Sequence, residues 1–380
     1  MSGPIPSSAH PEEALTVLTR ELETLFGRGV DALLDPAAFN ELALRVFALQ
    51  FEANQVYRGF CERRRVTPDT LTRWEDVPAV PATAFKHVDL VCGDPSAAEA
   101  IYLTSGTSSR GEQRGRHHVP RVALYRAAAL PNLRAHLVPE DRPLAVLSLI
   151  PSPTAAPRSS LSAMMGFVAE EWGDPVRWLG LADQGSDPGA FRRAAEEVGE
   201  SGRPALVAGT AFEFVHLLDG LARAGETLAL PPGSRIMETG GFKGRARAVE
   251  RAELYAALEA RLGVSRYRVV NEYGMTELLS QLYEPVLAEG AGAVGRHVAP
   301  PWLKVRALDP VTLAPLAAGG TGLLAFFDLA NVGSVCHVLT EDLGAVSADG
   351  VRLQGRSPGA EPRGCSLAVE DLLAATEGRR

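Results

Sequence analysis

The residues best suited to chemistry lie between Ile101 and Gln113, where a short apolar run opens into a loop rich in hydroxyl groups, glycine and arginine. Backbone N–H groups at glycines, together with serine and threonine hydroxyls, can surround the oxygens of a phosphate. The loop is not a Walker A motif, because no lysine and hydroxyl follow its second glycine. We interpret it as a nucleotide phosphate loop, although a plain surface turn has a similar composition.

The centre of this loop has the pattern T-S-G-T-S, which resembles the signature loop of the adenylate-forming enzymes. Those enzymes make an acyl-AMP from a carboxylic acid and ATP. The resemblance assigns phosphate binding to Thr104, Ser105, Gly106, Thr107 and Ser108. In the family a lysine follows a few positions later, whereas Arg110, Arg114 and Arg116 supply the positive charge here. A guanidinium is always ionised and can donate two hydrogen bonds to phosphate oxygens, so arginine can provide this charge.

A second motif, N-E-Y-G-M-T-E at 271–277, follows the apolar run Y-R-V-V and resembles the Y-G-x-T-E element of the same enzymes. The ring of Tyr273, which precedes Gly274, can stack on adenine. The Thr276 hydroxyl can reach the α-phosphate, and the Glu277 carboxylate can hold Mg²⁺ against phosphate oxygens. This motif therefore predicts ATP and Mg²⁺ as cofactors.

Two further matches lie near the end of the chain. The run T-E-D-L-G at 340–344 resembles the family's T-G-D-L-G, although Glu341 stands where the family has glycine. The Asp342 carboxylate, in a predicted tight turn, is suited to accept both ribose hydroxyls. Arg356 follows Gly355 at the place where the family has an arginine close to the ribose and phosphates.

The chain is shorter than the common adenylating enzymes. In those enzymes, the arginine that Arg356 matches lies at a hinge, and the chain continues after it into a domain with a catalytic lysine. Lys243, in the glycine-rich M-E-T-G-G-F-K-G, is the candidate for a replacement. Glycines permit a close approach of the backbone, and an ammonium there can neutralise charge on the pyrophosphate or the carboxylate. A lysine in a surface turn is the alternative interpretation.

The short tail contains a candidate nucleophile, Cys365, which lies at the start of a predicted final helix and two residues after Arg363. The helix N-terminus and the guanidinium both favour the thiolate form. The run from Arg356 to Cys365 can span at most about 30 Å, which permits contact with a bound acyl-adenylate.

The compact core, G-G-F-K-G and the ending G-R-S-P-G-A-E-P-R-G-C-S-L together resemble the LuxE-type acyl-protein synthetases. The resemblance covers about Val77 to Leu373. It implies that a carboxylic acid, expected to be a fatty acid, is activated as acyl-AMP and transferred to Cys365 as a thioester. It also implies delivery to a partner such as an acyl reductase or an acyl-carrier protein. The predicted catalytic residues are Cys365, Lys243 and Glu277.

Two other functions remain open at this point. A free-standing acyl-CoA or aryl-CoA ligase of the phenylacetate type would use CoA as the thiol. A non-catalytic acyl-binding or nucleotide-binding subunit of a larger complex would explain the absent lysine domain.

The elements that must position these residues alternate between strands and helices. Short apolar runs at 144–150, 205–209, 235–241 and 267–274 are separated by helical patterns, which is typical of parallel β-α-β crossovers with ligands beyond the carboxyl ends of the strands. The predicted fold is therefore α/β: an adenylate-forming core with a small β subdomain. The predicted divisions are a helical segment at 1–65, the core at 66–282, the β subdomain at 283–354 and a short tail at 355–380.

The bulk properties exclude several classes of function. A net charge of −8 argues against general affinity for nucleic acid or for an anionic membrane surface. No apolar run has the roughly 20 residues of a membrane span, and the N-terminal run lacks the pattern of a signal peptide, so the cytoplasm is the expected location. The four cysteines, Cys61, Cys92, Cys336 and Cys365, have no metal-binding spacing and are expected to be free thiols.

Overall fold

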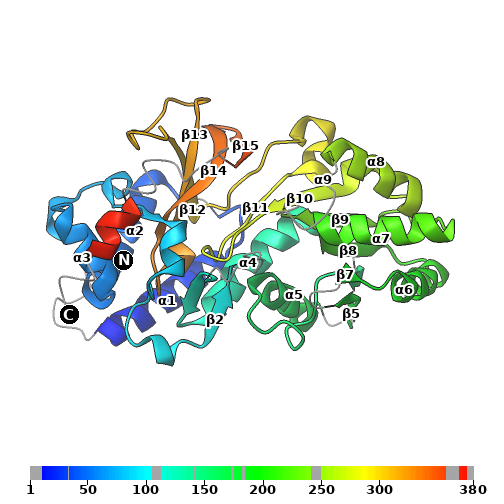
Figure 1. Ribbon diagram of the computed structural model, residues 1–380, viewed down its shortest axis with the longest axis horizontal. Coiled ribbons are helices and arrows are strands. Elements are labelled where there is room, and N and C mark those ends of the chain that lie inside the picture. The colour runs from blue at the N-terminus through cyan, green and yellow to red at the C-terminus, as the bar shows by residue number, and fades with distance from the viewer. Residues whose placement is uncertain are drawn as a thin grey trace.

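The computed structural model describes residues 11–32, 34–104, 113–140, 143–172, 175–181, 185–240, 250–356 and 368–374. Two main sheets organise this part of the chain: a six-stranded sheet in which most strands pair parallel, here called the parallel sheet, and a five-stranded sheet in which most strands pair antiparallel, here called the antiparallel sheet. The antiparallel sheet lies between the N-terminal helices and the parallel sheet (Figure 1). Across the described ranges, no helix has the length and apolar character needed to cross a membrane.

The larger sheet has six strands in the order β11-β10-β9-β8-β4-β5. Its strands are β4 (Ala145–Ser148), β5 (Arg177–Trp178), β8 (Ala205–Thr210), β9 (Arg235–Thr239), β10 (Val269–Tyr273) and β11 (Leu282–Tyr283). Neighbouring strands from β10 to β5 are parallel, and β11 pairs antiparallel with β10. The β-α-β interpretation of this region is therefore confirmed.

Alternate side chains of these strands enter two different hydrophobic cores. On β8, Leu206 packs in the core that also contains Met164 of α5, whereas Val207 packs in the core that contains Phe214 of α7. Because successive strand residues point to opposite faces, a continuous apolar run is what a sheet covered on both faces requires. The covering helices are α4 (Val122–Leu137), α5 (Ser160–Glu171), α6 (Pro188–Ser201), α7 (Ala211–Ala224) and α8 (Arg251–Leu262).

The second sheet contains the predicted strands of the region after residue 282 and two strands that periodicity did not reveal. It consists of β1 (Val80–Pro81), β12 (Leu303–Leu308), β13 (Thr321–Asp328), β14 (His337–Ser347) and β15 (Gly350–Arg356). β1 pairs parallel with β14 and comes from a proline-rich segment far earlier in the chain. Two residues are too few for a period-2 pattern, so this strand has no local signal in the sequence.

Three helices at the N-terminus pack on this antiparallel sheet: α1 (Pro11–Phe26), α2 (Pro36–Ala53) and α3 (Gln55–Arg63). Asp35 caps α2 by accepting hydrogen bonds from two backbone N–H groups at 2.9 Å. Asn54 ends α2 and caps α3. The buried amide of Gln50 donates to the Asn331 carbonyl at 2.8 Å, which fixes α2 against the end of β13.

Short elements complete the described structure. The remaining strands are β2 (Ala100–Leu103), β3 (Arg116–Val119), β6 (Gly180–Leu181) and β7 (Gly185–Ser186), and α9 spans Val286–Glu289. The 3₁₀ helices are η1 (Pro68–Thr70), η2 (Trp74–Asp76), η3 (Ala82–Lys86), η4 (Pro95–Ala97), η5 (Arg266–Arg268), η6 (Gly290–Ala293) and η7 (Leu329–Asn331).

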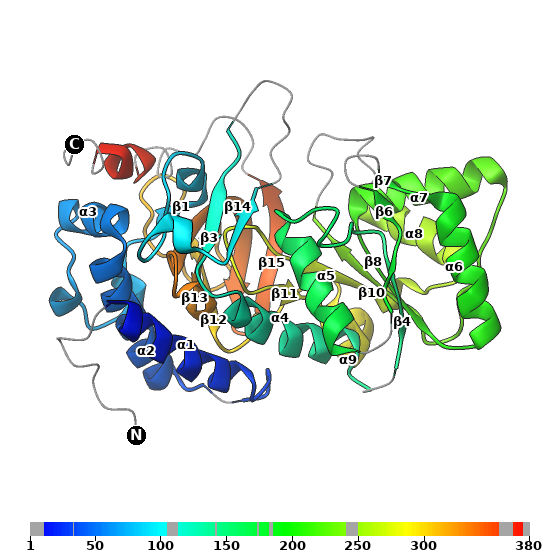
Figure 2. The same cartoon turned by 90° about the horizontal axis from the view of Figure 1, so that it is seen from below.

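A last helical segment, 368–374, lies beside α3 (Figure 2). Its Leu372 is fully buried, and Asp371 accepts a hydrogen bond from Arg64 at 2.9 Å.

Candidate active site

The first predicted motif begins at Thr104, directly after β2, and β2 pairs with β3 in a two-stranded hairpin. Thr104 and Gly115 close the base of the loop: the Thr104 N–H donates to the Gly115 carbonyl, and the Gly115 N–H donates to the Thr104 hydroxyl, both at 2.9 Å. A Cβ atom at Gly115 would lie 2.8 Å from a side-chain carbon of Thr104, so only glycine fits. The Arg114 guanidinium donates to the Thr104 carbonyl at 2.6 Å. Ser105, Gly106, Thr107 and Ser108 lie outside the described residues, as does Arg110.

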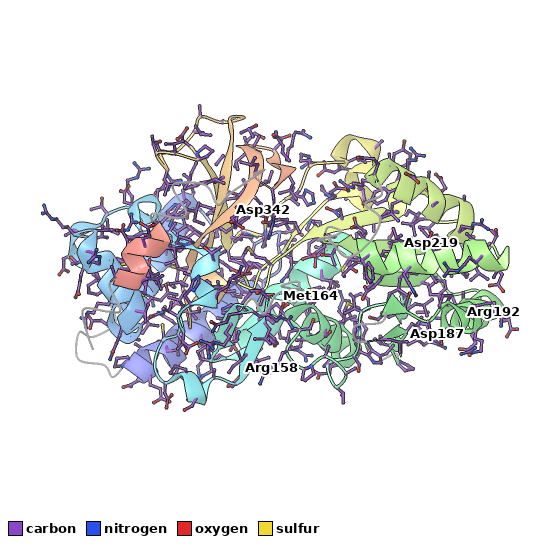
Figure 3. The ribbon with its side chains drawn as sticks, in the orientation of Figure 1. Arg158, Met164, Asp187, Arg192, Asp219 and Asp342 are labelled. Atoms are coloured by element: carbon purple, nitrogen blue, oxygen red, sulfur yellow. The ribbon has the colours of Figure 1, made fainter. Side chains whose placement is uncertain are left out.

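Three predicted site residues from different segments meet at one carboxylate. The Tyr273 hydroxyl at the end of β10 donates to Asp342 Oδ2 at 2.7 Å, and Arg356 Nε donates to Asp342 Oδ1 at 3.3 Å. Figure 3 shows Asp342 on β14, where the antiparallel sheet approaches the strands of the parallel sheet. Burial first, and then the Asp342 charge, raises the pKa of the Tyr273 hydroxyl well above its usual value, so Tyr273 is a neutral donor.

The backbone around Asp342 differs from the prediction. The run 340–344 was expected to form a tight turn, but it belongs to the long strand β14, in which Asp342 pairs with Arg356 of β15. The pairing register shifts between Asp342 and Gly344, where two residue steps on β14 lie opposite three on β15, and Gly355 of β15 has a φ of 88°. Because residue 341 lies inside an extended strand, its backbone does not need the glycine that Glu341 replaces.

The loop after Tyr273 is shaped by a buried carboxylate. Glu272, which is 4% exposed, accepts a hydrogen bond from the Thr239 hydroxyl at the end of β9. A Cβ atom at Gly274 would lie 2.3 Å from a Glu272 carboxylate oxygen. A side chain at the glycine of the predicted Y-G-x-T-E motif would therefore displace the Glu272 carboxylate from its present position beside Gly274.

A second buried carboxylate holds the other end of the same loop. Asp328, at the end of β13, accepts hydrogen bonds from the backbone N–H groups of Leu279 and Ser280 at 3.0 and 2.9 Å. It also accepts from the Ser280 hydroxyl at 2.7 Å and from the Ala330 N–H at 3.0 Å. The antiparallel sheet thus fixes both ends of the loop, through Asp342 at Tyr273 and through Asp328 at Ser280.

His117 connects the two motifs directly. It lies on β3, shortly after the predicted phosphate loop, and its Nδ1 is 2.6 Å from the carbonyl oxygen of Thr276. The residue is 1% exposed, and its ring packs against Phe85 in a T-shaped arrangement with a centroid distance of 5.5 Å. His117 was not among the predicted site residues, because a histidine in a short strand carries no local signal for a contact with a residue so distant in the chain.

Glu277 is the predicted ligand of Mg²⁺. Glu277 is buried, and its backbone carbonyl accepts a hydrogen bond from the Asn331 side-chain amide at 2.7 Å. Within the described ranges, no group of three His, Cys, Asp or Glu side chains is arranged to hold a metal ion by itself. One carboxylate is nevertheless compatible with Mg²⁺ that arrives bound to ATP, since Mg²⁺ commonly takes one or two protein carboxylates and completes its shell with phosphate oxygens and water.

A buried polar network lies on the face of β9 and β10 that is opposite to Thr239 and Glu272. Glu238 accepts hydrogen bonds from the amide of Asn271 at 2.5 Å and from the hydroxyl of Tyr255 at 3.1 Å. The Asn271 oxygen is 2.7 Å from His297 Nε2. Burial raises the pKa of Glu238 to about 7. Asn271, which begins the second motif, is thus committed to holding the strands together.

The structure describes three of the four cysteines. Cys61, Cys92 and Cys336 are free and buried, as expected for free thiols. Burial raises the pKa of Cys61 and of Cys92 to about 12, so neither is a thiolate near neutral pH. Cys365 and Lys243 lie outside the described residues.

A family model described as the LuxE acyl-protein synthetase matches residues 35–374. The chain belongs to this family. It is 25% identical to the long-chain-fatty-acid–luciferin-component ligase of Vibrio harveyi over 352 residues, which cover 88% of each chain. The corresponding ligase of Aliivibrio fischeri is 23% identical over 356 residues, again 88% of each chain.

One solved structure in particular shows that this LuxE family member has the adenylate-forming fold. The structure of 2-hydroxyisobutyryl-CoA ligase in the postadenylation state with 2-HIB-AMP has a TM-score of 0.61 and 18% identity, over 84% of this chain and 67% of that one. ATP-bound MatB from Rhodopseudomonas palustris has a TM-score of 0.48 and 18% identity, and this chain spans 49% of its length. The predicted family, the ligase class and the fold are therefore confirmed.

Proposed function

We propose that this LuxE family member activates a carboxylic acid, of the fatty acid class, with ATP to form an acyl-AMP. The acyl group is then transferred to Cys365 as a thioester and delivered to a partner protein such as an acyl reductase or an acyl-carrier protein. The observation that carries the proposal is that Tyr273, from a distant segment, meets Asp342 and Arg356, which are partners on the neighbouring strands β14 and β15, at one partly exposed carboxylate.

The Asp342 carboxylate fits the ribose of a nucleotide. An ionised carboxylate has about four lone-pair sites, and Tyr273 and Arg356 occupy two of them. The remaining sites can accept two vicinal hydroxyls. The Tyr273 ring stacks with Phe326 at a centroid distance of 5.6 Å, so adenine would stack on the other face of the ring.

The phosphate end of the nucleotide would lie between the hairpin and the loop after Tyr273. Thr104 at the base of the hairpin and Thr276 supply hydroxyls, and Glu277 supplies a carboxylate for the Mg²⁺ that accompanies ATP. The ion would neutralise phosphate charge as it develops. Residues 105–108 and Lys243 remain expected contributors to the same charge stabilisation.

The chemistry follows from these positions. A carboxylate oxygen of the acid attacks the α-phosphorus, an acyl-O–P bond forms, and pyrophosphate leaves with the electron pair of the broken P–O bond. The Cys365 thiolate then attacks the acyl carbon, a C–S bond forms, and AMP leaves. Dividing one difficult substitution into two is the usual gain of covalent catalysis.

The other cysteines support the choice of Cys365. Cys61, Cys92 and Cys336 are each buried, and burial raises the pKa of all three thiols. A thiolate is the reactive form, so these three are poor acceptors of an acyl group.

The test uses radiolabelled fatty acid and ATP, followed by denaturing gel electrophoresis and treatment with hydroxylamine. Wild type and the control Cys92→Ala are expected to carry hydroxylamine-labile label, whereas Cys365→Ser is expected to carry none while still consuming ATP. Labile label that persists on Cys365→Ser would contradict the acceptor assignment. AMP release that requires CoA and is insensitive to loss of Cys365 would instead favour an acyl-CoA or aryl-CoA ligase.

A further inference from the structure

We propose that His117 is a positioning residue that sets the distance between two segments: the base of the β2–β3 hairpin, at Thr104 and Gly115, and the loop that carries Thr276. This inference rests on the proposed binding of ATP at these segments. His117 itself would not touch the nucleotide, because its ring hydrogen bond goes to the Thr276 backbone.

The hydrogen bond defines the chemical form of the ring. A carbonyl oxygen can only accept, so Nδ1 of His117 must carry the proton that is donated to Thr276. Burial lowers the pKa of His117 to about 4, which leaves the ring neutral near pH 7. Its Nε2 therefore carries no proton, and this buried nitrogen has no hydrogen-bond partner. A single directed bond, rather than a charge, is what His117 supplies.

The hairpin is rigid at the point where His117 leaves it. Thr104 and Gly115 exchange two hydrogen bonds at the base of the loop. Arg116, the next residue, forms an ion pair with Asp89 at 2.9 Å. His117 follows with its bond to Thr276, so the strand that returns from the phosphate loop is attached at three successive positions.

The loop of Thr276 is equally constrained on its far side. Asp328 holds Leu279 and Ser280 by their backbone N–H groups, and Asn331 donates to the Glu277 carbonyl at 2.7 Å. These contacts fix the loop to the antiparallel sheet. His117 is the side chain that joins this fixed loop to the hairpin. A displacement of about 1 Å between catalytic groups can cost about a hundredfold in rate, so this one bond matters to function more than its net stability suggests.

The chain contains a matched control for His117. His337 on β14 is also buried, and its Nδ1 is 2.7 Å from the carbonyl of Val77. Burial lowers its pKa to about 4 as well, and its Nε2 also lacks a partner. His337 bonds a segment outside both motifs, so its loss should remove the same kind of interaction without moving the two segments that His117 joins.

The experiment compares two amides that imitate different ring nitrogens. Asparagine places an N–H donor near the position of Nδ1, whereas glutamine places it near Nε2. We expect His117→Asn to keep the affinity for Mg-ATP, measured by calorimetry, and the kcat of acid-dependent ATP–pyrophosphate exchange within about threefold of wild type. We expect His117→Gln and His117→Leu to lose about tenfold or more in both, a size typical of misplaced catalytic groups.

The controls are His337→Asn, His337→Gln and His337→Leu, with thermal unfolding of every variant. They are expected to lower the melting temperature as the His117 variants do, with unchanged ATP affinity and kcat. Equal activity of His117→Asn and His117→Gln, or losses that follow melting temperature across both sets, would overturn the proposal.

The two proposals fail in different ways. Wild type that binds Mg-ATP but exchanges no pyrophosphate with any acid would refute the proposed reaction, while the binding data would still decide the role of His117. Wild type that does not bind Mg-ATP would refute both.

Discussion

Two aspartates of the antiparallel sheet hold opposite ends of the same loop, and they do so in different ways. Asp328 is fully buried, and its oxygens accept from three backbone N–H groups and the Ser280 hydroxyl. Asp342 has a side chain that is 20% exposed, and it accepts from two side chains, Tyr273 and Arg356.

The difference separates a carboxylate whose acceptor sites are used by the fold from one that can accept further hydrogen bonds. The four bonds to Asp328 use its acceptor capacity, and burial raises its pKa because the charge has lost water. Asp342 keeps acceptor sites and solvent access. The same residue type, in one sheet, thus fixes the loop in one place and remains able to receive hydroxyls in the other.

The largest effect is expected for Asp328→Ala. This change leaves three backbone N–H groups and a hydroxyl without their acceptor in a dry site, which should lower the free energy of unfolding by about 3 kcal/mol or more. Urea unfolding followed by circular dichroism measures it. Asp342→Ala is the control, with a smaller expected loss of about 1 kcal/mol, because this partly exposed carboxylate holds two side-chain donors and no buried backbone N–H groups. Equal losses in the two variants would remove the distinction between the carboxylates.

Asp342→Asn should affect nucleotide binding and leave the fold intact. The amide keeps the shape but exchanges one acceptor oxygen for a donor, so ribose hydroxyls and the Tyr273 hydroxyl lose a charged acceptor. We expect the KM for ATP to rise about 10-fold to 100-fold, the cost of one or two charge-assisted hydrogen bonds. An ATP titration of pyrophosphate exchange gives the KM, and a KM unchanged from wild type would place the ribose elsewhere.

Tyr273→Phe tests the same carboxylate from the other side of the bond. The ring and its stacking on Phe326 remain, and the hydroxyl that orients Asp342 is lost. We expect the KM for ATP to rise about threefold to tenfold, the size of one net hydrogen bond. An effect larger than that of Asp342→Asn would indicate that the Tyr273 hydroxyl contacts the nucleotide itself.

The smallest effect concerns Glu238, a third buried carboxylate that receives two side-chain donors and no backbone N–H among the contacts described above. Burial raises its pKa from 4.5 to about 7, so its stabilising contribution is complete below about pH 4.5 and is lost as the pH rises through 7. Between about pH 6 and pH 8, the free energy of unfolding should fall by about 1 kcal/mol from this group. Glu238→Gln should remove this slope in urea unfolding measured across that range. A slope that stays in the variant would assign it to another group.

The sequence predicted most of the parallel sheet because short apolar runs that alternate with amphipathic helical patterns carry a strong signal. It also predicted that Tyr273, Asp342 and Arg356 would share one site, through their resemblance to a known order of motifs. His117 and Asp328 were not predicted, since each acts through one contact with a residue far away in the chain. The turn expected at 340–344 was wrong because this run continues strand β14, and the pairing with β15 that extends the strand is a contact the local motif does not reveal. The division into segments and the roles of Lys243 and Cys365 remain predictions.

The most direct test of the central claim is acid-dependent ATP–pyrophosphate exchange, measured with a panel of fatty and aryl acids for wild type, Cys365→Ser and Asp342→Ala. We predict exchange with at least one fatty acid in wild type and in Cys365→Ser, and its loss in Asp342→Ala at ATP concentrations that saturate the wild type. Absence of exchange with every acid, or exchange that survives unchanged in Asp342→Ala, would contradict adenylate formation at this site.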